Sequence, residues 1–307
     1  MTRARKVQVS LTDTPYYHLI SRCVRRAFLC GNLGKKSFEH RRGWLVDRIE
    51  FLASTFSIGV CSYAIMSNHY HLVIKVNSNK DWSDKHVLSA WASLYQLPML
   101  CERFMADEFM CKAELRVVHQ LISQYRARLM DLSWFMKCLN EYIAKMANKE
   151  DGCTGCFWEG RFKSQALLDE KALLTCMAYV DLNPIRAAMA SNPETSDYTS
   201  IQARIKNKKS WLLRFNQDEI PYYLTDYIAL VDYSGRAQLD NKRGSIANNI
   251  PEVFQRLNLN PNSWLKELKN FRSKGRTAVG TVAQLKAFCK RMQAKWLVAN
   301  TLTSALE

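Results

Sequence analysis

Two histidines separated by one residue constrain this chain more than any other feature of its sequence. They lie at the start of the stretch 69–76, in which apolar residues predominate as in a β-strand. Side chains alternate between the two faces of a strand, so His69 and His71 share one face with Val73 and Lys75. Two imidazoles beside a lysine form a candidate metal site suited to a phosphate group. The alternative interpretation is a pair of half-exposed surface histidines.

The sequence around this pair predicts a mixture of strands and helices. Three further stretches read as strands: residues 16–22, 59–66 and 161–168. The turn Ser67-Asn68 joins the second of them to the histidine strand, which predicts a hairpin. Apolar residues recur at helical spacing in the segments 37–56, 82–130 and 131–148.

A helix after Asp169 presents the second group with possible chemistry. Asp169 can cap the start of this helix, and Pro184 disfavours a helical conformation at Asn183, so the helix is expected to end there. Tyr179 projects roughly 150° away from the centre of the apolar stripe of the helix. Asn183 follows one turn later, within about 40° of Tyr179, so the phenol and the carboxamide lie one above the other. Most helical tyrosines serve packing, but a position off the core face weakens that interpretation here.

Charge points to a polyanionic partner. The 307 residues include 44 Lys and Arg against 28 Asp and Glu, which gives a formal net charge of +16. Nucleic acid is the partner that such an excess favours. No run of 18 apolar residues could span a bilayer, so no membrane association is expected, and the ten scattered cysteines fit reduced thiols. We therefore expect a cytoplasmic, nucleoid-associated protein.

Three ordered motifs resemble those of a known family. They are the sequences Ser67-Asn-His-Tyr-His-Leu-Val73, Phe157-Trp-Glu-Gly-Arg-Phe-Lys-Ser164 and Tyr179-Val-Asp-Leu-Asn-Pro-Ile-Arg-Ala187. Together they are similar to the IS200-like single-tyrosine (Y1) HUH transposases, and among these to the REP-associated tyrosine transposases. The similarity runs from about residue 16 to residue 200. It implies an α+β fold with a ferredoxin-like antiparallel sheet and helices on one face.

The resemblance also implies an activity and assigns roles to residues. His69 and His71 would bind a divalent metal with Asn183, and Tyr179 would attack single-stranded or hairpin DNA. A tyrosine hydroxyl titrates near pH 10 and is a poor nucleophile at neutral pH without help, which a metal ion can give by polarising the phosphate. Imidazole and amide ligands suit Mn²⁺ as well as Mg²⁺, so either ion is expected. The product would be a 5′-phosphotyrosine and a free 3′-hydroxyl, and the reverse reaction would join strands.

Cations near aromatic rings supply candidate DNA contacts, because single strands bind to grooves that combine the two. Three arginines follow the first predicted strand, and a tryptophan and two basic residues surround the fourth. The candidates are Arg22, Arg25, Arg26, Trp158, Arg161 and Lys163. Ordinary surface charge beside a buried aromatic explains them equally well.

The chain departs from short members of that family in two places. A helical insertion at about 79–130 separates the histidine strand from the long helix, and a basic segment of about 100 residues follows residue 200. We expect a catalytic domain over residues 1–200 and a mainly helical accessory domain over 201–307, in a monomer or a homodimer.

Two functions from different classes fit the sequence. The first is a transposase that cleaves and rejoins DNA through Tyr179. The second is a domesticated, sequence-specific DNA-binding protein without strand-transfer activity. A third possibility, a metal-dependent hydrolase that uses water, would tolerate a phenylalanine at position 179.

Overall fold

A computed structural model describes the chain in two compact units. The described residues are 9–24, 29–33, 36–206, 211–238, 250–271, 276–293 and 298–302. Unit 1 combines residues 1–43, 60–75 and 158–307, and unit 2 combines residues 44–59 and 76–157. The boundary that we expected near residue 200 does not separate these units, because the segment after it belongs to the same unit as the histidine strand.

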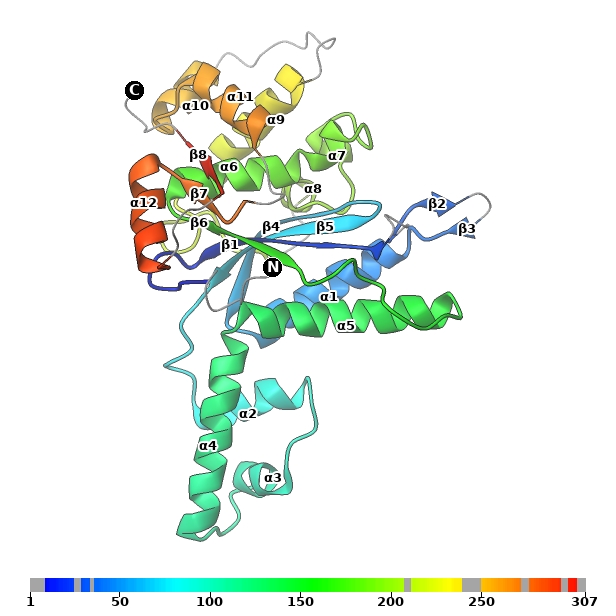
Figure 1. Ribbon diagram of the computed structural model, residues 1–307, viewed down its shortest axis with the longest axis vertical. Helices are drawn as coiled ribbons and strands as arrows, with labels where there is room; N and C mark the ends of the chain where they lie inside the picture. The colour runs from blue at the N-terminus through cyan, green and yellow to red at the C-terminus, as the bar shows by residue number, and fades with distance from the viewer. Residues whose placement is uncertain are drawn as a thin grey trace. The chain divides into compact units, whose positions relative to one another are not determined.

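Unit 1 is built on a six-stranded sheet in the order β4-β5-β1-β6-β7-β8 (Figure 1). Its strands are β1 (Tyr16–Arg22), β4 (Ile58–Ile65), β5 (His69–Val76), β6 (Lys163–Leu167), β7 (Ala278–Gly280) and β8 (Ala299–Thr301). β1 lies antiparallel to both β5 and β6, whereas β7 runs parallel to β6 and β8 parallel to β7. The pairs that β1 makes with β5 and β6 are antiparallel, as expected for residues 1–200, but the segment after residue 200 adds two parallel strands, so the sheet as a whole is mixed.

The remaining elements of unit 1 are short strands and helices. They are β2 (Asn32–Leu33), β3 (Lys36–Ser37), α6 (Glu170–Asp181), α7 (Asn183–Arg186), the 3₁₀ helix η3 (Pro193–Thr195), α8 (Ser200–Ile205), α9 (Leu224–Gln238), α10 (Ile250–Arg256), α11 (Pro261–Asn270) and α12 (Val282–Arg291). The region after residue 200 is thus mainly helical, as predicted, apart from β7 and β8.

Helix α6 begins as the sequence predicts but ends slightly earlier, and Asn183, which Pro184 was expected to keep out of a helix, is instead the first residue of the next helix. The Asp169 carboxylate accepts a hydrogen bond from the backbone N–H of Ala172 at 2.6 Å, which satisfies one of the free donors of the first turn. The helix ends at Asp181, and Pro184 lies in the first turn of the next helix, α7, where its missing N–H costs nothing. Burial extends beyond the predicted apolar stripe to most of α6, because α11 packs against it as well.

A buried carboxylate ties the end of α6 to the segment after it. Asp181 is fully buried and accepts hydrogen bonds from Ser200 Oγ at 2.5 Å, from the backbone N–H of Ile201 at 3.0 Å and from Tyr227 Oη at 2.5 Å. Burial is the main cause that raises the pKa of Asp181 to about 6. The network fixes α6 relative to α8 and α9.

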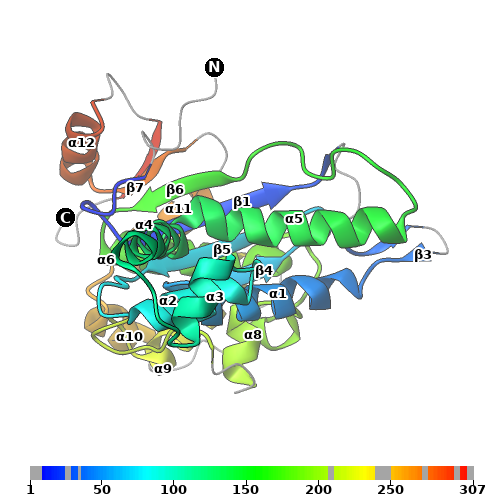
Figure 2. The same ribbon diagram turned by 90° about the horizontal axis from the view of Figure 1, so that it is seen from below.

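Unit 2 holds the helices that precede and follow the histidine hairpin in sequence. They are α1 (Arg41–Thr55), α2 (Asp84–Ala92), α3 (Met99–Met105), α4 (Lys112–Leu129) and α5 (Leu132–Glu150). Figure 2 shows α2 and α3 beside α4, where the Trp91 ring stacks on Tyr125 with centroids 4.5 Å apart. Three helices thus occupy the segment predicted as a helical insertion. None of the described helices is long and apolar enough to cross a membrane.

Candidate functional site

Cross-strand register gathers polar side chains on one face of the sheet. Residues directly opposite each other in paired strands point to the same face. His71 of β5 pairs with Ile20 of β1, which pairs with Lys163 of β6. In the same way Arg22 pairs with His69. The two predicted metal ligands, one predicted arginine and one predicted lysine therefore share a face.

Another row of the same face brings in two residues that the sequence analysis missed. His18 of β1 lies opposite Val73 of β5 and Gln165 of β6. His18 is fully buried, and its Nε2 lies 2.9 Å from Nδ1 of His71, while its Nδ1 lies 3.2 Å from Oε1 of Gln165. The amide oxygen can only accept, so His18 carries its proton on Nδ1 and accepts from the Nδ1–H of His71 through Nε2. The hydrogen bonds from His71 to His18 and from His18 to Gln165 fix the tautomer of His71.

This tautomer leaves a lone pair on Nε2 of His71. That nitrogen is buried and makes no hydrogen bond within the described part of the chain. Burial, followed by the neighbouring His18 and His69, lowers the pKa of His71 well below its ordinary value, so the ring is neutral at pH 7. A neutral imidazole with an orphaned nitrogen, whose other nitrogen donates to a fixed acceptor, has the form of a metal ligand.

His69 also has one ring nitrogen in a hydrogen bond and a lone pair on the other. Its Nδ1 lies 2.6 Å from Oδ1 of Asn68, so Nδ1 carries the proton and Nε2 the lone pair. Burial and the positive charge of Arg22 lower the pKa of His69 to about 4. The centroids of the His69 and His71 rings are 4.9 Å apart. Both rings are thus neutral and adjacent, and each is hydrogen-bonded through Nδ1. Two histidines that hold one metal ion through Nε2 have this arrangement.

The protein side chains alone do not complete a metal site. Among the described residues, no group of three or more His, Cys, Asp or Glu side chains is arranged to hold an ion. Two imidazoles leave the other positions to an amide, water or a substrate oxygen, which is the donor set of an open catalytic site. Asn183, the predicted third ligand, donates from Nδ2 to the backbone carbonyl of Tyr179 at 3.1 Å. Its role as a ligand stays a prediction.

Tyr179 lies against the histidines. Its ring meets that of His71 edge-on at 5.9 Å between centroids and that of His18 at 6.2 Å. Phe271, which follows α11, packs on Tyr179 at 4.6 Å. The Arg186 guanidinium lies 5.1 Å from the centroid of the Tyr179 ring. Segments far apart in the sequence thus bring the phenol, two imidazoles and a cation into one cluster, with the Tyr179 side chain half-buried.

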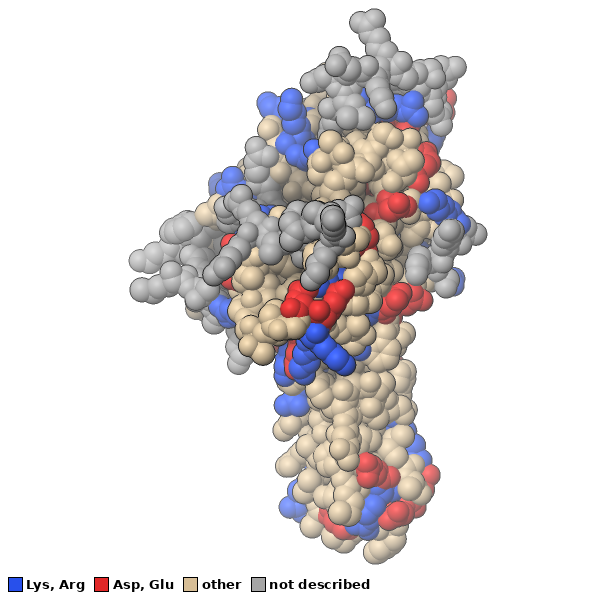
Figure 3. All heavy atoms as spheres, turned by 90° about the vertical axis from the view of Figure 1, so that its right-hand side faces the viewer, with Lys and Arg blue, Asp and Glu red and all other residues tan. Residues whose placement is uncertain are grey.

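The candidate DNA contacts have different positions. Arg161 and Lys163 are exposed, and Arg22 is half-buried beside His69. Trp158 is 92% buried, with its ring edge-on to Tyr70 at 5.7 Å, so it serves the core and does not offer a surface for stacking. The remaining two candidates, Arg25 and Arg26, lie outside the described residues. On the face in Figure 3, basic and acidic side chains are interspersed.

The chain shows little similarity to known proteins. No known family matches the sequence, and no curated protein matches it. Among solved structures, the chain is similar to a REP-associated tyrosine transposase bound to a REP hairpin, with 10% sequence identity and a TM-score of 0.39. The likeness covers 70% of this chain and 93% of that chain. A likeness of this extent does not indicate an activity.

Proposed function

We propose that the protein is a metal-dependent DNA strand transferase whose nucleophile is Tyr179. The observation that carries this proposal is the contact between the Tyr179 ring and His71, whose orphaned Nε2 faces no protein partner among the described residues. A chain order of β1, α1, β4, β5, α5 and β6, with β2–β3 and α2–α4 as additional elements, supports the ferredoxin-like domain that the motifs imply. A net charge of +16 favours a polyanionic substrate.

Each residue has a defined part in this reaction. His69 and His71 would hold Mg²⁺ or Mn²⁺ through their Nε2 atoms, and Asn183 is the proposed third ligand. When bound, the ion polarises the scissile phosphate and stabilises the leaving oxygen. The Tyr179 oxygen attacks phosphorus, the bond to the 3′-oxygen breaks, and the phenol proton ends on the released 3′-hydroxyl. Attack by another 3′-hydroxyl reverses the step and frees Tyr179, so the joining needs no energy source.

The experiment follows the covalent intermediate. Purified protein is incubated with Mn²⁺ or Mg²⁺ and single-stranded or hairpin oligonucleotides from the flanks of its gene, labelled at either end. We expect an adduct that survives denaturation and carries the fragment 3′ of the cut. Tyr179→Phe should abolish it, while Tyr142→Phe, at an exposed tyrosine of unit 2, should not. Cleavage that survives Tyr179→Phe would establish the hydrolase instead.

One observation favours the non-cutting alternative. Phe271 packs on Tyr179, and the Tyr179 ring is half-buried. If this contact persists when DNA binds, the phenol cannot reach phosphorus, and the protein would act as a DNA-binding protein. Binding of flanking hairpins without any adduct, in both metals, would support that second function.

A further inference from the structure

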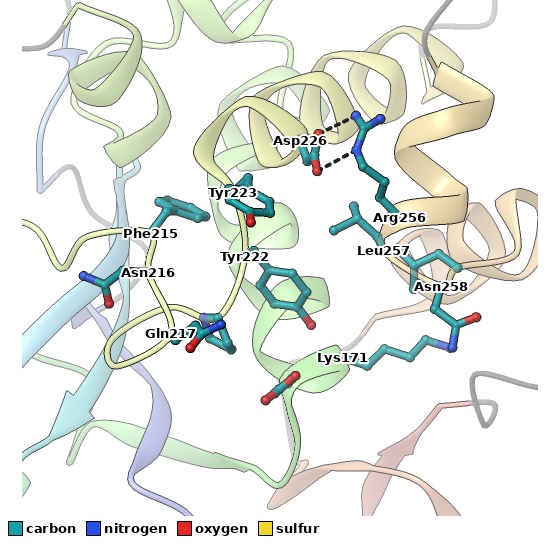
Figure 4. A pocket seen from close by; sticks show the side chains of 13 residues that line it. Lys171, Phe215, Asn216, Gln217, Tyr222, Tyr223, Asp226, Arg256, Leu257 and Asn258 are labelled. Atoms are coloured by element: carbon teal, nitrogen blue, oxygen red, sulfur yellow. Dashed lines mark hydrogen bonds and ion pairs between the residues drawn. The ribbon is translucent and has the colours of Figure 1, made fainter.

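A second site lies in unit 1, outside the histidine cluster. A cavity of about 820 Å³ opens between the first turn of α6, the loop before α9 and the turn after α10. Its lining includes Lys171, Phe215, Tyr222 and Asn258. Figure 4 shows the Tyr222 ring between the 215–217 loop on one side and Asn258 on the other. The volume is that of a site for a small organic group.

The charges around the cavity exclude a phosphate as its main occupant. Arg256 donates two hydrogen bonds to the Asp226 carboxylate, at 2.6 Å and 3.1 Å (Figure 4). Lys171 lies 3.2 Å from both carboxylate oxygens of Glu267. Each cation is therefore neutralised by its own carboxylate, and an anion would have to compete with these pairs. A neutral ligand does not face this competition.

The remaining lining fits a planar ring with a polar edge. Tyr222 and Tyr223 offer aromatic surface, and the Tyr223 side chain is 75% exposed, whereas the Phe215 ring already packs against Tyr227 and Arg204. At the rim the exposed amide of Gln217 offers both donors and an acceptor, while Asn216, whose Oδ1 already accepts from the backbone N–H groups of Asp218 and Glu219, offers its Nδ2 donors. Stacking on rings combined with amide hydrogen bonds is how proteins hold unpaired nucleobases.

Tyr222 adds a hydrogen-bonding group that the protein itself does not use. Its hydroxyl makes no hydrogen bond to another described residue, although most of the ring is buried. Burial raises the pKa of Tyr222, followed by the nearby carboxylates of Glu170 and Asp169, so the hydroxyl stays protonated. A buried phenol that can still donate is a group to which the edge of a base can bind.

The cavity and the proposed nucleophile lie on the same helix. Lys171 belongs to the first turn of α6 and Tyr179 to its last turn, eight residues later. Eight residues of α-helix correspond to about 12 Å along its axis. This distance is one that a few nucleotides of single strand can span, over the elements that cover the buried middle of α6.

We propose that this cavity binds an unpaired nucleobase of the strand on which Tyr179 acts, and so contributes to the choice of cleavage position. The proposal rests on the proposed function, because it assumes a single-stranded DNA substrate. It assigns sequence recognition to residues 215–223 and 257–259, in the segment that follows the part of the chain with the three motifs.

The test combines a change in the DNA with a change in the protein. Fluorescence anisotropy measures binding of the full-length protein to a flanking strand, in which an abasic site is moved one nucleotide at a time. We expect one position where base removal weakens binding about 5- to 100-fold. In Tyr223→Ala this loss should shrink to less than about twofold, because the wall on which the base stacks is gone. Phe109→Ala, at an aromatic residue of unit 2 that is 89% exposed, is the matched control.

A second variant and a crosslink keep the result interpretable. Gln217→Ala, at an exposed rim residue, should change which base is preferred at that one position. A 5-iodouracil placed there should crosslink on irradiation to a peptide within residues 215–223. An adduct at Tyr179 with no position that depends on Tyr223 or crosslinks to this peptide would overturn the cavity proposal and leave the proposed function standing. Absence of single-strand binding and of the adduct would overturn both.

Discussion

Substituting His18 tests whether the chain of hydrogen bonds behind His71 prepares a metal ligand. His18→Phe keeps a ring of similar shape in a fully buried position but removes both nitrogens. The Nδ1–H of His71 then loses the acceptor at 2.9 Å, and Gln165 loses the partner at 3.2 Å. His71 becomes free to move its proton to Nε2, the nitrogen that would hold the metal.

The size of the effect follows from what each lost bond does. A buried donor left without a partner costs about 1–3 kcal/mol of folding free energy. Loss of the group that orients a metal-bound histidine weakens metal affinity about 10- to 100-fold. This range corresponds to about 1.4–2.7 kcal/mol of binding free energy. We therefore expect a folded variant whose affinity for Mn²⁺ is lower by one to two orders of magnitude.

Calorimetric titration with Mn²⁺ measures this affinity directly, without reference to DNA cleavage. His18→Gln is the partial rescue, because its amide oxygen can accept from the Nδ1–H of His71. His86→Phe is the matched control: His86 is exposed in unit 2, where its ring stacks on Trp82 at 4.3 Å between centroids. Equal Mn²⁺ affinity in the wild type and in His18→Phe would refute the argument, as would a loss of the same size in His86→Phe.

One further measurement on His18→Phe and two further substitutions test the surroundings of the site. Burial lowers the pKa of His18 to about 4, below its ordinary value near 6.5. The folded protein is therefore destabilised as the pH falls from 6.5 towards 4, because the unfolded chain binds the proton more readily. Between pH 6.5 and 5, urea denaturation should show a decrease in the free energy of unfolding that is up to about 2 kcal/mol larger in the wild type than in His18→Phe. Asp181→Ala leaves the hydroxyls of Ser200 and Tyr227 without their acceptor, and we expect the free energy of unfolding to fall by about 3 kcal/mol or more in the same assay. Phe271→Ala removes a ring that is only 2% exposed and packs on Tyr179. It should lower the free energy of unfolding by about 3–5 kcal/mol and speed iodination of Tyr179, as measured by mass spectrometry.

Local patterns were sufficient to predict the elements that carry the site. The strand at residues 16–22 and the histidine strand have the predicted positions, because each is long and bounded by turn residues. The cap at Asp169 depends only on neighbouring residues and is found, whereas the helix breaks at Leu182 and Pro184 begins a new helix with Asn183. The metal ligands, the nucleophile and the DNA contacts other than the buried Trp158 stay predictions.

Side chains whose role depends on pairing between distant strands escaped prediction. His18 and Gln165 meet only because β1 lies between β5 and β6 in one particular register. A shift of that register by one residue would place His18 on the opposite face from His71. Nothing in the local sequence around His18 specifies this register. The available signal was a third histidine within a predicted strand, residues 16–22.

Short parallel strands also lay beyond local reasoning. β7 and β8 have three residues each, too few for an alternating pattern to distinguish them from a loop. They form because the edge of β6 offers unpaired backbone groups, which the chain after residue 275 satisfies. For this reason β7 and β8, which lie in the expected accessory domain, belong to the same sheet as the histidine strand.

The incorporation of this segment has a consequence for the proposed chemistry. Phe271 covers one side of Tyr179, and Arg186, whose guanidinium lies over the same ring, donates to the backbone carbonyl of Leu268 at 3.2 Å. The surroundings of Tyr179, the proposed nucleophile, therefore depend on residues more than 80 positions after it. If Tyr179 acts on DNA as proposed, the Phe271 ring can stack on a base, and its displacement from Tyr179 by an incoming nucleotide would expose the phenol when a strand is present. Access to Tyr179 would then be coupled to DNA binding by the same segment that forms the base cavity.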